Sequence, residues 1–371
     1  MDVTRVPTLF DPLPLGDLTL PHRIVMAPLT RMRATAPDDV PNDLMLEYYR
    51  QRAGAGLIVS EGTQISPIGK GYMDTPGIYS VEQVAGWRRI TDAVHAESGL
   101  MAAQLWHVGR VSHESFHDGG LPVSASALEY RNRTTIKGED GRPLRANCPT
   151  PRALTAEEIA GTVEDFRRAT LNAREGGFDL VELHGAHGYL LHQFLSAVSN
   201  HRTDQYGGPL ANRLRFVLEV LDAVCGAWEP ARVGIRVSPL GSFNGLEADE
   251  IDEVLALAAE LDERGVGFLH LSEPDWAGGP VLDDDFRSRL RAAFSGVIIG
   301  AGNYTSKKAE RLLAAGLIDA AAFGRAFIAN PDLPERLRNG AELNEPLPAT
   351  FYGGDAEGYT DYPDLAAGVV T

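Results

Sequence analysis

Cysteine and lysine are both scarce in this chain of 371 residues, and each shortage excludes a kind of site. The two cysteines, Cys148 and Cys225, are too few for a disulfide framework or a thiolate metal cage, and they favour a reducing compartment. The lysines are Lys70, Lys137, Lys307 and Lys308. None of them lies in a predicted strand, so a Schiff-base aldolase or a pyridoxal-dependent site would lack its nucleophile.

Long apolar runs and an excess of positive charge are also absent. No stretch reaches the roughly 18 apolar residues of a membrane span, and the first residues, MDVTRVPTLF, lack the basic start and apolar centre of a signal peptide. We therefore expect a cytoplasmic protein. With 34 basic against 51 acidic residues the net charge is −17, which argues against binding to nucleic acid or to an anionic membrane. An anionic ligand would need a local group of arginines.

Short apolar runs alternate along the chain with amphipathic stretches. The predicted strands are residues 24–29, 56–61, 100–106, 178–183, 233–238, 267–272, 296–301 and 319–324. The predicted helices are residues 43–53, 81–97, 155–175, 209–227, 248–264, 283–294, 305–315 and 332–338. Eight nearly continuous apolar strands, each followed by a helix, indicate a parallel sheet covered by helices. Eight such units close into a (β/α)8 TIM barrel, so the predicted fold class is α/β.

The helix at 155–175 has the clearest boundaries of the eight. Thr155 and Glu158 form a capping box, which satisfies backbone N–H groups at the start of a helix. The pair Gly176-Gly177 ends it.

Three segments lie outside the alternation of strands and helices. Residues 1–23 are predicted to be an extended or hairpin lid over the barrel floor. Residues 107–154, rich in glycine, proline and polar side chains, form an excursion after strand three and not a second domain. Residues 340–371 are expected to lie as a tail over the barrel. The whole chain, residues 1–371, is thus predicted to be a single barrel domain.

The carboxyl ends of the predicted strands supply the candidate site, because active sites of such barrels lie there. Strands seven and eight end in GAGN and FGR. The glycines Gly302 and Gly324 let backbone N–H groups, with Asn303 beside them, approach an anion, and Arg325 supplies a charge. This is the usual phosphate position of the fold. The alternative is that these glycines only make tight turns.

Arg236, at the end of strand five, is predicted to point into the same pocket. An unpaired buried charge is costly, so we expect it to meet an anionic or electron-rich partner. A structural salt bridge is the alternative.

Two histidine patterns resemble metal sites. His113 and His117 occur as H-E-x-x-H, the zinc motif of a helix that places both rings on one face. Here the segment DGGLP at 118–122 ends any helix after about one turn, so we expect no zinc.

The second pattern is the turn HGAHGY at 184–189, which follows the apolar run FDLVEL. His184 and His187, with His192 as a third ligand, are a possible metal set, but the turn holds no carboxylate and Glu182 is set back inside the strand. Two histidines in a polar, glycine-rich turn at this end of a barrel instead favour ligand binding.

Eight ordered segments then form a pattern that extends over almost the whole chain. They are APLTR at 27–31, EYYRQRA at 47–53, AQLWHVGR at 103–110, DLVELHGAHGYLLHQFLS at 179–196, HRTDQYGG at 201–208, IRVSP at 235–239, IIGAGNYT at 298–305 and AFGRAFIANPDL at 322–333. This pattern resembles the Old Yellow Enzyme family from residue 7 to residue 363, and most of all its bacterial branch of N-ethylmaleimide and nitrate-ester reductases.

The resemblance implies a noncovalent flavin mononucleotide (FMN) in the barrel mouth. Pro28, Leu29 and Thr30 would lie beside the reactive edge of the flavin. The residues implied around the rest of the cofactor are Gly62 and Gln104 at the ring, Arg236 at the electron-rich pyrimidine side, and Gly302, Asn303, Gly324 and Arg325 at the phosphate end. Gly62 departs from the alanine frequent in the family, and we expect slightly more room near the ring.

The same resemblance implies roles for the HGAHGY turn. His184 and His187 would grip the carbonyl or nitro oxygen of an electron-poor substrate, because two N–H donors stabilise the charge that develops when hydride adds to the conjugated carbon. Tyr189 resembles the proton donor of the family, and a tyrosine that merely lines the pocket is the alternative. The predicted catalytic set is Thr30, His184, His187 and Tyr189. The residues predicted to wall the pocket, unless they are ordinary packing, are Tyr72, Trp106, Phe243, Trp276 and Tyr352.

The predicted function is an FMN-dependent ene-reductase that works in two half-reactions. NADPH or NADH gives hydride to the flavin and leaves, and an activated alkene, maleimide, nitro compound or nitrate ester takes its place, so no Rossmann domain is needed. The expected partners are therefore small molecules, and the sequence selects neither one nicotinamide nor one oligomeric state. Two other classes stay open, a zinc-dependent barrel hydrolase and a flavin-binding protein that has lost turnover.

Overall fold

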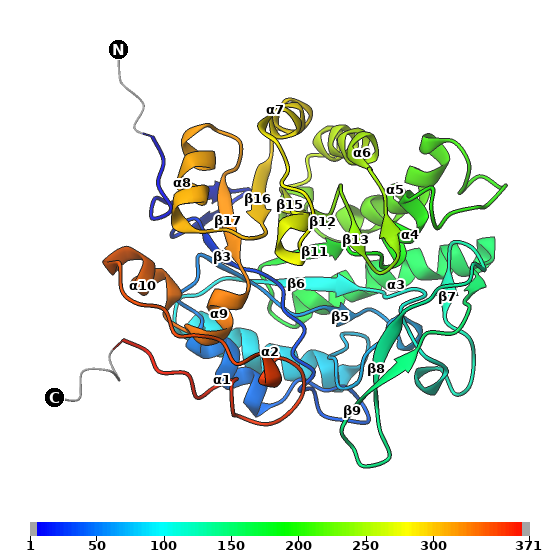
Figure 1. The fold of residues 1–371 in the computed structure, drawn as a ribbon, viewed down its shortest axis with the longest axis horizontal. Coiled ribbons are helices and arrows are strands. Elements are labelled where there is room, and N and C mark those ends of the chain that lie inside the picture. Colours follow the sequence, from blue (N-terminus) through cyan, green and yellow to red (C-terminus); the bar gives the residue numbers. More distant parts are fainter. Residues whose placement is uncertain (1–5, 366–371) are drawn as a thin grey trace.

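The computed structural model describes residues 6–365, and eight parallel strands within them close into a barrel (Figure 1). The barrel strands are β3 (Ile24–Met26), β4 (Leu57–Val59), β6 (Met101–Trp106), β11 (Leu180–His184), β12 (Val233–Val237), β15 (Phe268–Ser272), β16 (Val297–Ala301) and β17 (Ala320–Phe323). Each lies inside a predicted strand, except that β11 ends one residue later, at His184, so the predicted TIM barrel is confirmed. The outermost parts of the predicted lid and tail, residues 1–5 and 366–371, lie outside the described residues.

The strands pair around a closed ring. The order is β3, β4, β6, β11, β12, β15, β16 and β17, and β17 pairs again with β3. Every one of these pairs is parallel, and a short strand, β5 (Thr63–Gln64), runs parallel to β6 beyond the end of β4. Closure leaves no unpaired edge and brings all eight carboxyl ends to one face, where the site is expected.

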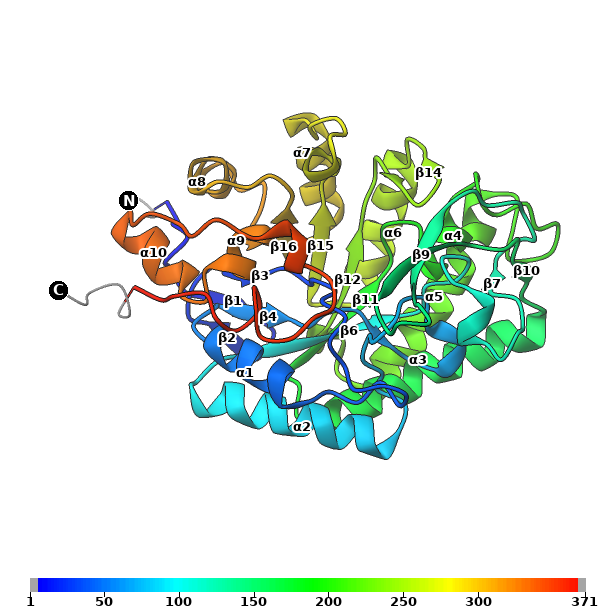
Figure 2. The same cartoon turned by 60° about the horizontal axis from the view of Figure 1, so that its bottom comes forward.

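Helices cover the outside of the barrel. Those predicted from the sequence are present as α1 (Asp43–Gln51), α2 (Val81–Ala96), α3 (Ala156–Glu175), α5 (Leu210–Ala227), α6 (Ile251–Glu263), α7 (Asp284–Ala293), α8 (Ser306–Ala314) and α10 (Leu333–Asn339). In Figures 1 and 2, α6, α7 and α8 lie on the opposite side of the barrel from α1 and α2. The predicted capping box of Thr155 and Glu158 starts α3. No helix in residues 6–365 has the length and apolarity that a bilayer crossing needs.

Two further helices were not predicted. α4 (Leu190–Leu195) follows the HGAHGY turn, and α9 (Arg325–Ala329) follows β17. Six and five residues are too few to show a helical period in the sequence.

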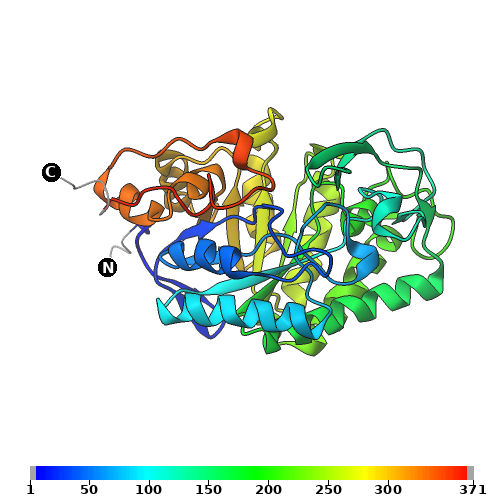
Figure 3. The ribbon, with the colours of Figure 1, turned by 90° about the horizontal axis from the view of Figure 1, so that it is seen from below.

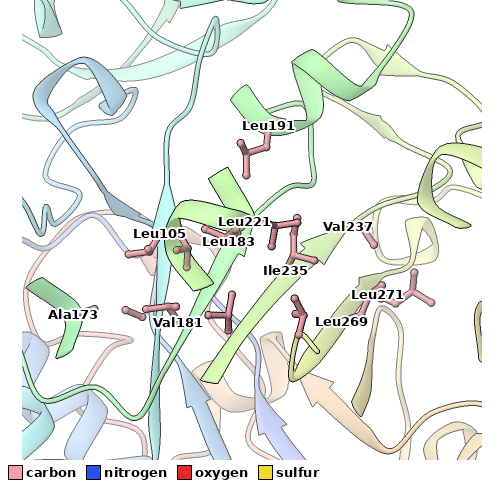
Figure 4. Close-up of a cluster of buried hydrophobic side chains, with 14 of the residues drawn as sticks. Leu105, Ala173, Val181, Leu183, Leu191, Leu221, Ile235, Val237, Leu269 and Leu271 are labelled. Carbon is pink, nitrogen blue, oxygen red and sulfur yellow. The ribbon is translucent and has the colours of Figure 1, made fainter. Parts of the chain in front are cut away.

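Alternate residues of each strand face the helices and the barrel interior. On β11, Val181 and Leu183 pack outward with apolar side chains of neighbouring strands and of α3 and α5, as Figure 4 shows. Leu180 belongs to a second apolar cluster inside the barrel. By the same alternation, Glu182 and His184 point into the barrel, so one strand supplies both core and site.

The amino-terminal segment closes the barrel floor. β1 (Leu13–Leu15) and β2 (Leu18–Leu20) form an antiparallel hairpin. Leu13, Leu15 and Leu20 join the apolar cluster of the barrel interior. The predicted lid is thus a hairpin that seals the end of the barrel opposite the site.

The excursion after β6 contains strands that the sequence did not reveal. β8 (Arg133–Lys137) and β9 (Pro143–Asn147) form an antiparallel hairpin that extends away from the barrel strands (Figure 1). The excursion also holds a smaller pair, β7 (Val123–Ser124) with β10 (Arg152–Ala153). A second small pair, β13 (Ser242–Phe243) with β14 (Leu246–Glu247), lies outside the excursion and follows β12. β8 (RTTIK) is polar apart from Ile136, and β9 (PLRAN) begins with a proline, so the pair lacks the sustained apolar alternation from which strands are predicted.

Buried arginines hold the carboxyl-terminal segment. Arg31 donates to the carbonyl oxygens of Phe351 (2.9 Å) and Gly358 (3.0 Å), and Arg52 donates to that of Tyr359 (3.4 Å). Figure 3 shows this red segment passing the blue helix α1, from which Arg52 follows directly. These bonds fix the course of the segment where it reaches the barrel mouth.

Candidate active site

A cavity of about 1000 Å³ opens at the carboxyl ends of the barrel strands. Its size lies at the upper end of the range for small-molecule sites. It is bordered by every predicted site residue except Gly62, namely Pro28, Leu29, Thr30, Tyr72, Gln104, Trp106, His184, His187, Tyr189, Arg236, Phe243, Trp276, Gly302, Asn303, Gly324, Arg325 and Tyr352. Segments from both ends of the chain therefore meet at one cavity.

Gly62 does not border the cavity. A Cβ atom built on it would lie 2.4 Å from Cε3 of Trp106, so the indole fills the space beside the glycine. The expectation that Gly62 leaves more room near the ring is therefore wrong, because the indole of Trp106 fills that space. An alanine here would require the buried indole to shift.

The HGAHGY turn holds His187 in a strained but supported backbone conformation. β11 ends at His184, and His187 adopts a left-handed φ of +57° before Gly188 at +73°. Such a φ costs energy in a residue other than glycine. The backbone N–H of His187 donates to Oγ of Ser238 (3.0 Å), and Nδ2 of Asn244 donates to its carbonyl (2.8 Å). The two imidazoles then lie 5.4 Å apart between ring centroids.

Both imidazoles are neutral at this site. Burial, with the nearby Arg236 guanidinium, holds the pKa of each ring well below the ordinary histidine value. Nδ1 of His184 accepts the N–H of Ala186 at 3.4 Å, which leaves Nε2 to carry the proton. Nε2 of His187 lies 2.8 Å from Oγ of Ser272. Each neutral ring keeps one N–H that it can donate.

Tyr189 stands at the start of α4, two residues after His187. Its hydroxyl lies 3.1 Å from that of Tyr72, and its ring packs edge-on against Trp106 and His184 at centroid distances of 5.0 and 4.9 Å. Burial raises the pKa of Tyr189 to about 12, so it keeps its proton at neutral pH. A protonated phenol beside a cavity is a suitable general acid.

Aromatic rings surround the histidines. Phe243 and Trp276 flank His187 at centroid distances of 5.9 and 5.7 Å, and Tyr72 stacks on Trp106 at 5.5 Å. Tyr352, which is 57% exposed, reaches the cavity from the carboxyl-terminal segment. These rings give the cavity flat apolar walls beside its polar groups.

Arg236 is a buried cation with few partners. Its Nη2 donates to Oγ of Ser272 at 3.4 Å, and its Nε has no partner. Within residues 6–365 no carboxylate forms an ion pair with Arg236, so it is not part of a structural salt bridge. A buried guanidinium that faces a cavity needs an acceptor there, and the electron-rich side of a flavin ring fits this requirement.

The predicted phosphate end lies at the exposed rim of the cavity. The backbone N–H of Asn303 donates to Oδ1 of Asp275 (2.9 Å), and Nζ of Lys308 lies 2.8 Å from both Asp275 and Glu273. Arg325 is exposed at the same rim. A phosphate that takes the N–H of Asn303 would have to displace Asp275, and Lys308 and Arg325 are the cations beside it.

Sequence reasoning missed two groups of residues at this cavity. The β8–β9 hairpin and the residues before it contribute Arg131, Asn132, Arg133, Thr135 and Arg145. The sequence feature that could have revealed them is the high local density of arginine in a chain of net charge −17. The second group lies behind the cavity, where Glu182 accepts from Gln104 and contacts His270. Nothing in the sequence indicates that contact, because the residues lie on three different strands.

The two histidine patterns that resemble metal sites have other partners. Glu114–Phe116 form a single 3-10 turn, and Nε2 of His117 lies 2.8 Å from Oγ of Ser112. His192 pairs with the buried Glu250. Among residues 6–365, no three His, Cys, Asp or Glu side chains are grouped so that they could hold a metal ion.

These observations define the class of the protein. A closed barrel with donors, a phenol and a cation around a deep cavity at its carboxyl face is a (β/α)8-barrel enzyme. The model of the NADH:flavin oxidoreductase / NADH oxidase family matches residues 8–344. The chain belongs to this family, the Old Yellow Enzyme family, and is an NAD(P)H:flavin oxidoreductase.

Relatives match over nearly the whole chain. The structure of morphinone reductase is 51% identical with a TM-score of 0.95 and covers 99% of both chains. Its complex with tetrahydroNAD gives a TM-score of 0.94 at 51% identity, over 98% of this chain and 99% of that one. The Old Yellow Enzyme homologue from Zymomonas mobilis is 39% identical with a TM-score of 0.91, over 96% and 99% of the two chains. 12-Oxophytodienoate reductase 2 of Arabidopsis thaliana is 42% identical over 364 residues, 96% of each chain.

Proposed function

We propose that this enzyme is an FMN-dependent reductase of electron-poor alkenes, with NADPH or NADH as the hydride donor. The observation that carries the proposal is the meeting of His184, His187, Tyr189 and Arg236 at one cavity. Two neutral N–H donors and a protonated phenol suit a substrate whose oxygen gains negative charge and whose carbon then needs a proton. The names of two relatives, reductases of morphinone and of 12-oxophytodienoate, agree with this chemistry.

The residues around the cavity fit a noncovalent FMN. Bound there, the flavin would supply the hydride. The unpartnered Nε of Arg236 supports this placement, since it leaves the guanidinium available to the ring. The other residues proposed to hold FMN are Pro28, Leu29 and Thr30 at the reactive edge, Gln104 at the ring, and Gly302, Asn303, Gly324 and Arg325 at the phosphate end. Gly62 is left out of this set because it does not border the cavity.

The HGAHGY turn would act on the substrate. His184 and His187 would donate to its carbonyl or nitro oxygen and so hold the conjugated carbon in place for hydride. Tyr189 would give its proton to the carbon next to the activating group. The aromatic walls, including Trp276 and Phe243, would exclude water from the substrate's apolar part.

Enones, maleimides and nitroalkenes are the substrate classes that this arrangement suits best, with nitrate esters as a further class. Each has an electron-poor centre joined to an oxygen that two N–H donors can hold. These are also the substrates of the N-ethylmaleimide and nitrate-ester reductase branch, to which we assign this chain.

The direct test is the colour and turnover of the purified protein. We expect a yellow protein that releases FMN on denaturation and oxidises NADPH or NADH when an enone is added. A colourless protein with stoichiometric zinc would indicate a barrel hydrolase instead. A yellow protein that reduces none of these compounds with either nicotinamide would indicate a flavin-binding protein without turnover.

The arginines of the β8–β9 hairpin predict a preference for NADPH. Arg133 and Arg145 border the cavity, and Arg145 is anchored by bonds to Oγ1 of Thr135 (3.1 Å) and to the carbonyl of Arg133 (2.7 Å). NADPH differs from NADH by one phosphate, which guanidinium groups bind through charge-assisted hydrogen bonds. In the variant with Arg133→Ala and Arg145→Ala, the KM for NADPH is expected to rise about tenfold. A change of this size corresponds to the loss of about one charge-assisted hydrogen bond at an exposed site.

Steady-state kinetics with both nicotinamides check this prediction. The KM for NADH should change much less in the double variant, because NADH lacks the phosphate. Arg142→Ala is the matched control, since Arg142 lies on the same hairpin with its side chain 86% exposed and does not border the cavity. An equal rise in KM for both nicotinamides would contradict recognition of the phosphate by the hairpin.

A further inference from the structure

The interior of this barrel is polar on one side only. Barrel interiors are usually filled by layers of branched apolar side chains. On β16, β17 and β3 the interior residues are small or apolar, among them Ile299, Ala320 and Val25. On β6, β11 and β15 the buried interior residues include Gln104, Glu182 and His270. A carboxylate in such a place is costly unless it is well bonded.

Glu182 is bonded through both of its oxygens. Oε1 accepts a hydrogen bond from Nε2 of Gln104 at 2.7 Å, and Oε2 lies 2.7 Å from Nδ1 of His270. Glu182 is in register with Gln104 on one neighbouring strand and with Gly234 on the other. β12 therefore contributes no side chain at this level, and Glu182 reaches across it to His270 on β15.

These contacts decide which way the amide of Gln104 faces. The two ends of an amide are similar in shape, but an ionised carboxylate attracts the NH2 group and repels the carbonyl oxygen. With Nε2 turned toward Glu182, Oε1 of Gln104 accepts no hydrogen bond from any residue in the described range 6–365. Gln104 borders the cavity, so the wall presents a hydrogen-bond acceptor at this point.

We propose that Glu182 is a positioning residue that locks Gln104 with its carbonyl oxygen toward the cavity, and thereby selects a cofactor ring with an N–H at that edge. The inference rests on the proposed FMN function. The pyrimidine edge of an oxidised flavin carries one N–H, at N3, between two carbonyl oxygens. Arg236 supplies donors for a carbonyl oxygen, and Gln104 supplies the acceptor for N3–H, so the wall and the ring edge are complementary.

Without the carboxylate, the amide of Gln104 loses this preference. In Glu182→Gln the new side chain can turn either its oxygen or its nitrogen toward Gln104, because His270 can donate or accept by changing tautomer. Both orientations of Gln104 then become accessible. The volume of the side chain is unchanged, so packing around the site is preserved.

The test follows the N3–H of bound FMN without using activity. With FMN labelled with 15N at N3, NMR measures how fast the N3 proton exchanges with water. Titration measures the ratio of the Kd values of N3-methyl-FMN and FMN. Wild type is expected to protect the proton and to prefer FMN. In Glu182→Gln the proton is expected to exchange faster, and the preference to fall by about three- to tenfold, the value of one hydrogen bond.

Two further variants separate positioning from general damage. Ser60→Ala removes the acceptor of the backbone N–H of Gln104 (3.0 Å) without touching its side chain, so the preference for FMN should match wild type. Gln104→Leu should lose the preference. Adding Glu182→Gln to Gln104→Leu should not change the preference for FMN any further, because Glu182 acts through the side-chain amide of Gln104.

Two results would overturn the inference while leaving the proposed function intact. One is an equal preference for FMN over N3-methyl-FMN in wild type and Glu182→Gln. The other is an N3 proton that exchanges in the wild-type holoenzyme as fast as in free FMN, a measurement that stands even if the variant does not fold. A wild-type protein that binds no FMN would instead overturn the proposed function, and this inference with it.

Discussion

The variant with His184→Ala and His187→Ala is expected to reduce cyclic enones at least about 10²-fold more slowly than wild type while it keeps its flavin. Both rings border the cavity, and their lowered pKa values keep them neutral, so each offers one N–H. Loss of a single donor to a developing oxyanion typically costs about 10² to 10³ in rate. Neither ring lies at the phosphate end, so FMN should remain bound.

Stopped-flow mixing of chemically reduced enzyme with the enone measures this effect, because the nicotinamide does not take part. FMN released per protein should equal that of wild type. His113→Ala is the matched control, since His113 precedes the 3-10 turn at Glu114–Phe116 and does not border the cavity. Enone reduction at the wild-type rate by the flavin-loaded double variant would show that the substrate oxygen is held elsewhere.

Tyr189→Phe is expected to slow the oxidative half-reaction with enones by about 10² to 10⁴, the usual value of a positioned general acid. The phenol borders the cavity, and its raised pKa of about 12 keeps it protonated as the pH rises through the neutral range. Reduction of the flavin by NADPH should be almost unchanged. The rate of the oxidative half-reaction with nitro substrates should fall less, because the nitronate product is stable enough to leave the site and take its proton from water.

The neighbouring tyrosine provides the control for this second prediction. Tyr72 lies 3.1 Å from Tyr189 between hydroxyl oxygens and is equally buried in the wall. Tyr72→Phe removes a hydroxyl from the same pair but leaves the proposed donor in place, so its effect should be much smaller. Stopped-flow measurement of both half-reactions decides the matter. Equal enone reduction in wild type and Tyr189→Phe would show that the proton comes from another source.

Much of the architecture was predictable because its causes are local in the sequence. Each barrel strand is a short, nearly continuous apolar run, and runs such as Ile24–Met26 must be buried on at least one face. Thr155 and Gly176 mark the ends of α3 through backbone hydrogen bonds within a few residues. Once the barrel is recognised, closure places every strand end at one face, so the cavity-lining position of residues such as Gln104 and Arg236 follows from topology.

The β8–β9 hairpin and the carboxyl-terminal segment could not be predicted in this way, because local sequence patterns do not determine them. β8 and β9 pair through backbone hydrogen bonds, and their sequences RTTIK and PLRAN carry no sustained alternation of apolar and polar residues, so no strand period appears in the sequence. The carboxyl-terminal segment is held by arginines more than 300 residues away, such as Arg31 at the carbonyl of Phe351. Such contacts have no sequence signature, and they bring Arg145 and Tyr352 to the cavity.

The sequence by itself determined the barrel, the end at which the site lies and the residue types available there. The tertiary structure alone decided what fills the space beside Gly62, which neighbours keep His184 and His187 neutral, and which way Gln104 faces. The physical reason is that these properties depend on atoms from several strands packed at van der Waals or hydrogen-bond distance. Glu182 is an example. Its place on β11 follows from the sequence, but its effect on Gln104 depends on contacts with Gln104 on β6 and His270 on β15, which only the tertiary structure shows.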